Sequence, residues 1–146
     1  MLRTIRNYFF SAFREVFVYH HSSLEFRAKI YAILISAATE PLSHYQKTLE
    51  EIALDVYNDP DRANALTMTV KEYINKVHYK KHLGEEALLI DIIKELRLVP
   101  RYALKIEPEQ LERLRECTHD NDAKIYQDRL IDFFRKKRLD YEDFKR

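Results

Sequence analysis

The sequence predicts an all-α fold, a compact bundle of six or seven helices. The chain has 146 residues, of which 46% are hydrophobic and 34% charged, as in a single globular domain with a core of its own. It holds one glycine and four prolines, too few for an all-β domain, whose tight turns use glycine. Apolar residues recur at helical spacing along most of the chain.

The N-terminal segment, residues 1–21, is predicted to form an aromatic helix. Apolar side chains at helical spacing carry it to about residue 20, and its aromatic load is high for so short a segment. We interpret the following residues as a surface for a protein partner or a second copy of the chain: Tyr8, Phe9, Phe10, Phe13 and Phe17. The alternative is that this face packs on the bundle.

The next two helices are predicted from their start and stop signals. Ser22 and Glu25 form a capping-box pattern, and the helix behind them runs to about Thr39 before Pro41 stops it. This helix is apolar nearly all round, which predicts a central position. Ser43 with Gln46 repeats the capping-box pattern for the third helix.

Acid-proline pairs and glycine divide the rest of the chain. Asp59-Pro60 starts a helix to about Lys81, and Gly84 is interpreted as the connection to a helix over 85–98. After a short turn at 100–106, the predicted helices run from Glu107-Pro108 to about residue 117 and from "THDND" onward.

A degenerate internal repeat is one interpretation of this order. Residues 28–41 align with 87–100, since both are apolar helices closed by proline at the same spacing. The single domain, 1–146, would then hold the N-terminal helix 1–21, a first unit 22–82 and a second unit 85–146. Any two helical triplets share such a pattern, so the alternative of an unrepeated bundle stays open.

Composition excludes several classes of protein. Lys+Arg total 25 and Asp+Glu 24, which argues against a nucleic-acid-binding domain. The single cysteine, Cys117, excludes an intramolecular disulfide and suits a cytoplasmic protein. The longest apolar run, 30–38, is about half of the roughly 20 residues that span a bilayer, so no integral membrane protein is predicted. One glycine also excludes the usual phosphate-binding loops.

The histidine pair His78 and His82 is the first candidate metal site. Residues four apart share one face of a helix, and imidazole binds zinc and similar ions. A further ligand would come from Glu85, Glu86 or another histidine, among them His20, His21, His44 and His119. The alternative is that both histidines only complement the negative end of a helix dipole.

The stretch "RAKIYAILISAATEPLSHYQKTLEEIALDVY" resembles TerB-like domains, the small helical domains named for tellurite resistance. The resemblance implies a metal-binding acid at the break between two helices and a glutamate on the second helix. In this sequence Glu40 lies at the break, and Glu50 or Glu51 takes the position of the glutamate on the second helix.

The sequence therefore favours a non-enzymatic cytoplasmic interaction or regulatory module, because no catalytic constellation is predicted. The alternative is a TerB-like domain that binds a divalent metal ion.

Overall fold

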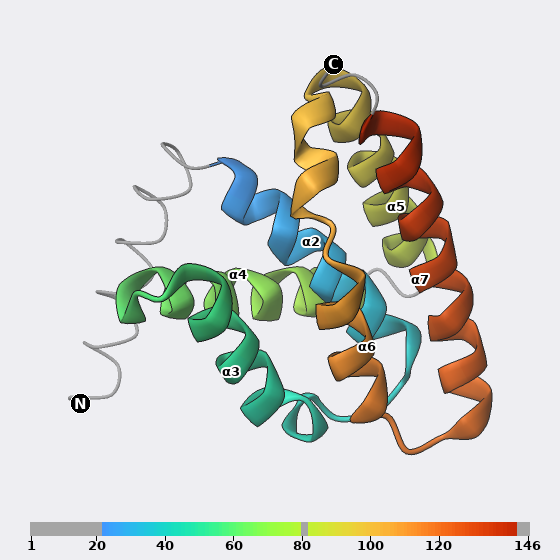
Figure 1. Ribbon diagram of the computed structural model, residues 1–146. Helices are drawn as coiled ribbons and strands as arrows, with labels where there is room; N and C mark the ends of the chain where they lie inside the picture. Colours follow the sequence, from blue (N-terminus) through green and yellow to red (C-terminus); the bar gives the residue numbers. More distant parts are fainter. Residues whose placement is uncertain (1–21, 80–81, 143–146) are drawn as a thin grey trace.

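The computed structural model describes residues 22–79 and 82–142, and within them the protein is all-α (Figure 1). The elements are α2 (Ser22–Ala37), η1 (Leu42–His44), α3 (Gln46–Tyr57), α4 (Pro60–Tyr79), α5 (His82–Leu98), η2 (Pro100–Lys105), α6 (Pro108–Glu116) and α7 (Asn121–Glu142), where η is a 3-10 helix. The predicted helix bundle is confirmed. The predicted helix over 1–21 lies outside the described residues.

Helix α2 is the centre of the bundle, as its apolar surface predicts. Every residue from Phe26 to Ser36 is buried, and the helix contacts α4, α5, α6 and α7. In Figure 1 it crosses the middle of the molecule, with the long α7 along one side. Its C-terminal end thereby reaches the surface between elements from both halves of the chain.

Two cations lie buried on α2 among the apolar residues. The Arg27 guanidinium Nη2 lies 2.8 Å from Glu107 Oε1, and Lys29 Nζ lies 2.7 Å from Asp91 Oδ2 and also pairs with Glu95. Burial alone would lower the pKa of Lys29, but the hydrogen bonds to Asp91 and Glu95 outweigh it and raise the pKa. Lys29 therefore stays charged inside the bundle.

The ends of the helices follow the local signals in most places. Asp59 Oδ1 accepts the Asp61 N–H at 3.0 Å at the start of α4, and α2 ends at Ala37, ahead of Pro41. The predicted capping box of Ser43 and Gln46 is wrong. Ser43 lies in η1, no side chain caps α3, and the Gln46 amide donates to Glu50.

The single glycine has a different role from the predicted one. Gly84 lies inside the first turn of α5, buried against α4, and not in the connection before it. A Cβ at this position would lie 2.5 Å from the carbonyl oxygen of Val77 and 2.7 Å from its Cα. Glycine is required there because the two backbones meet.

Candidate metal centre

The predicted histidine pair does not share a helix. α4 ends at Tyr79 and α5 begins at His82, so the helical spacing that would bring both imidazoles to one face is wrong. His78 is exposed, and the side chain of His82 lies outside the described part of the structure. The assignment of this pair as metal ligands stays a prediction.

A different group of side chains does converge. Among the described residues, Glu40, His44 and His119 each offer one ligand atom, and these atoms lie within 4.8 Å of one another. Glu40 lies in the connection after α2, His44 ends η1, and His119 lies in the connection from α6 to α7. Two regions that are distant in sequence, residues 40–44 and the connection at 117–120, thus meet at one end of the bundle. We call Glu40, His44 and His119 the Glu-His-His cluster.

The Glu40 carboxylate joins these segments through backbone hydrogen bonds. Its Oε1 and Oε2 accept the N–H of His119 at 3.0 and 3.1 Å, and Oε2 also accepts the N–H of Asp120 at 3.1 Å. Its Oε1 lies 2.8 Å from His44 Nδ1. The backbone donors of His119 and Asp120 reach Glu40 only when α6 and α7 are packed against the rest of the bundle.

These donors keep Glu40 ionised. The hydrogen bond from the backbone N–H of His119 is the main cause that lowers the pKa of Glu40 from 4.5 to about 2. Burial opposes this shift, while the Asp120 N–H, the His44 side chain and the charge of His119 add to it. The centre of the cluster therefore carries a negative charge at neutral pH.

The neighbours of the two histidines fix their position. Tyr45 follows His44, Thr118 precedes His119, and the two hydroxyls are 2.7 Å apart in the core. One residue further out, Cys117 Sγ lies 3.1 Å from Thr48 Oγ1. The connection from α6 to α7 thus runs along η1 and the start of α3. Side-chain contacts between the two segments hold them together.

The two imidazoles stack, with ring centroids 4.2 Å apart and 25° between their planes. Because Glu40 is ionised and can only accept, His44 donates its Nδ1–H to Glu40. Nε2 of His44 is then the ring nitrogen that remains to bind an ion. A carboxylate that orients a histidine in this way is the usual support of a zinc ligand.

The remaining predicted ligand, Glu50, is not part of this cluster. It is exposed, accepts a hydrogen bond from the Gln46 amide and lines a groove beside Leu54 and Pro60. The predicted partner surface, Tyr8, Phe9, Phe10, Phe13 and Phe17, lies outside the described residues.

The sequence predicts each residue of this cluster as a candidate ligand, but it does not predict that the three form one site. Glu40 was expected as a metal ligand beside Glu50, while His44 and His119 were expected only as partners of His78. The spacing of four between Glu40 and His44 is a usable signal, since they pair as on a helix turn although Pro41 lies between them. No local signal links His119 to them, because its approach depends on the packing of α6 and α7.

Comparison of the chain with family models, curated proteins and solved structures found no significant match. Within the described residues, no helix combines the length and the apolar character needed to cross a membrane.

Proposed function

We propose that this protein is a small helical domain that binds a divalent transition-metal ion, with Zn²⁺ as the first candidate, at the Glu-His-His cluster. The observation that carries the proposal is the convergence of three ligand atoms within 4.8 Å, two from residues 40–44 and one from His119, which is distant in sequence. Two imidazoles and a carboxylate are a common protein ligand set for zinc with one position left open.

The ligands need a small contraction to close on an ion. Zinc bound at about 2.0–2.1 Å in a tetrahedron has ligand atoms roughly 3.3 Å apart. His119 is exposed, so its side chain can turn toward the ion without disturbing the core. Glu40 acts as the third ligand, and its low pKa keeps the carboxylate ionised for that role.

The proposal refines the TerB-like alternative. The resemblance implies an acid at the break after the apolar helix, and Glu40 is that acid. The proposed partners of Glu40 are the two histidines and not Glu50. The site joins residues from both halves of the chain, so a bound ion would favour their packed arrangement. Such a site fits a regulatory binding module. Recognition of a protein partner through Phe9, Phe10 and their neighbours stays a prediction.

The test is metal binding to the purified full chain and its variants. Elemental analysis after incubation with Zn²⁺ and dialysis is expected to give one equivalent. A free ion concentration one hundred times the dissociation constant should stabilise the fold by about 2.7 kcal/mol. His119→Ala should abolish this stabilisation, and it is a mild change because the residue is exposed.

His78→Ala is the matched control, since it removes an exposed histidine outside the cluster. It should leave zinc binding unchanged. Absence of zinc in the protein, together with no thermal shift, would reject the proposal. Equal losses in His78→Ala and His119→Ala would show that the ion binds elsewhere.

A further inference from the structure

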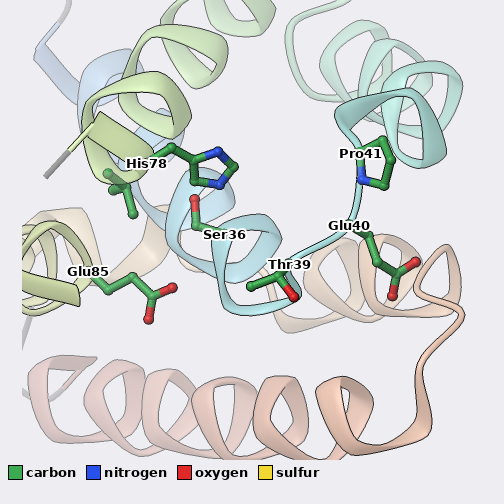
Figure 2. A pocket seen from close by; sticks show the side chains of 7 residues that line it. Ser36, Thr39, Glu40, Pro41, His78 and Glu85 are labelled. Carbon is green, nitrogen blue, oxygen red and sulfur yellow. The ribbon is translucent and has the colours of Figure 1, made fainter. Parts of the chain in front are cut away.

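A cleft opens at the surface where α2 ends, between α4 and α5. Its volume is about 580 Å³, within the range of small-molecule sites. It is lined by Ser36, Thr39, Glu40, Pro41, Val77, His78 and Glu85 (Figure 2). Glu40 borders both this cleft and the Glu-His-His cluster, while the other lining residues belong to the cleft alone.

Ser36 is the residue that points to a ligand. It is only 2% exposed, and its hydroxyl has no hydrogen-bond partner among the described residues. Figure 2 shows this hydroxyl directed to the side of α2 on which His78 lies. A buried hydroxyl without a partner costs free energy, and a polar group of a molecule in the cleft would satisfy it.

The charges around the cleft select the kind of molecule. Glu40 and Glu85 contribute carboxylates, and none of the described lining residues is a lysine or an arginine. Glu85 lies in the first turn of α5, where the helix dipole stabilises a negative charge. Val77 and Pro41 add apolar surface. The lining thus suits a molecule with an apolar body and a positive charge.

We propose that the cleft binds a small organic amine in its protonated form. The ammonium group carries three donors and faces the Glu85 carboxylate and the Ser36 hydroxyl. Its hydrocarbon part lies against Val77 and Pro41. Glu40 adds negative charge at the rim and is not required as a contact.

The test uses three probes of similar size: phenethylamine, phenethyl alcohol and hydrocinnamate. Each is titrated into the ¹⁵N-labelled full chain with EDTA present, so that the result does not depend on metal binding at the Glu-His-His cluster. Phenethylamine should shift the amide signals of Ser36, Thr39 and His78, and it should bind more tightly than the alcohol. Hydrocinnamate should bind most weakly.

Variants outside the Glu-His-His cluster separate this site from it. Glu85→Gln should weaken phenethylamine binding about tenfold, as expected for loss of a charge-assisted hydrogen bond. Ser36→Ala should weaken it about fivefold without lowering stability, because the hydroxyl has no partner to lose among the described residues. Glu86→Gln is the control, since this exposed neighbour does not line the cleft.

Three results would overturn the proposal: no shifts in the cleft with phenethylamine, equal affinity for hydrocinnamate, or equal losses in Glu85→Gln and Glu86→Gln. A lysine side chain carries the same ammonium group, so Nα-acetyl-lysine amide forms a fourth arm. Binding of that compound without phenethylamine would overturn the free-amine assignment and point to a lysine of a partner chain.

Discussion

Two junctions of the bundle are closed by different forces. Where α4 meets α5, the helices approach through Gly84 until a Cβ would lie 2.5 Å from the backbone of Val77. Where η1 meets the connection from α6 to α7, a charged carboxylate accepts backbone N–H groups, and two imidazoles stack beside it. The first junction depends on shape and the second on charge.

This difference separates their responses to solution conditions. Steric fit between backbones does not change with pH, salt or metal ions. The hydrogen bonds of Glu40 exist at full strength only while its carboxyl is ionised, and an ion bound beside it would add to them. Substitutions at the two junctions should therefore differ in their dependence on conditions as well as in size.

The largest effect is expected at the junction that depends on shape. Gly84→Ala places a Cβ against the Val77 backbone, and such overpacking should destabilise the fold by about 2 kcal/mol, even though alanine gains roughly 1 kcal/mol in helix propensity. Urea denaturation at neutral and at acid pH should give the same loss. Glu86→Ala on the same helix is the control, with a change within about 0.5 kcal/mol. A Gly84→Ala protein as stable as the wild type would show that the helices separate freely.

The next effect is expected at the junction that depends on charge. Glu40→Ala removes the acceptor for the His119 and Asp120 N–H groups and should destabilise the fold by about 1.5 kcal/mol at neutral pH. Denaturant unfolding measures it. Glu50→Ala, which removes an exposed glutamate from α3, should change stability by less than about 0.5 kcal/mol. Similar losses in the two variants would contradict the special position of Glu40.

The contribution of Glu40 should also vanish in acid. Its pKa is lowered from 4.5 to about 2 in the folded protein, so the unfolded chain takes up a proton at this carboxyl at a higher pH than the folded one. The stabilisation is complete above pH 4.5 and is lost as the pH falls toward 2. Unfolding free energies of the wild type and Glu40→Gln should therefore converge over this range. A difference that stays constant with pH would contradict the ionised carboxylate.

A smaller effect is expected from Tyr45→Phe, which removes the hydroxyl 2.7 Å from Thr118. Loss of this buried hydrogen bond should lower the free energy of unfolding by about 1 kcal/mol. It should also weaken zinc binding, because the contact between the residues adjoining His44 and His119 is lost. Calorimetric titration with Zn²⁺ tests the second point. The exposed Tyr126→Phe should change neither quantity. Unaltered zinc affinity in Tyr45→Phe would show that Glu40 alone aligns the two histidines.

The helices were predictable because their signals are local. Apolar periodicity places α2 at the centre, and Asp59-Pro60 marks the start of α4 at the right residue. Gly84 was misassigned because glycine serves turns and close helix contacts alike, and only the tertiary structure distinguishes them. The Glu-His-His cluster could be predicted only in part. Glu40 and His44 are close in sequence, but His119 reaches them through the Tyr45–Thr118 contact, which composition and spacing do not encode.

The two buried cations of α2 have a consequence for how the chain finds one arrangement. Arg27 and Lys29 are two positions apart, so they leave the helix about 200° apart and reach Glu107 on one side and Asp91 and Glu95 on the other. A one-residue slip would turn α2 by about 100° and press both charges against hydrocarbon. Because α2 is apolar nearly all round, it could otherwise pack in several rotated orientations. The two buried cations and their carboxylate partners distinguish one orientation from the rest. They select one orientation of α2 through the high cost of all the others.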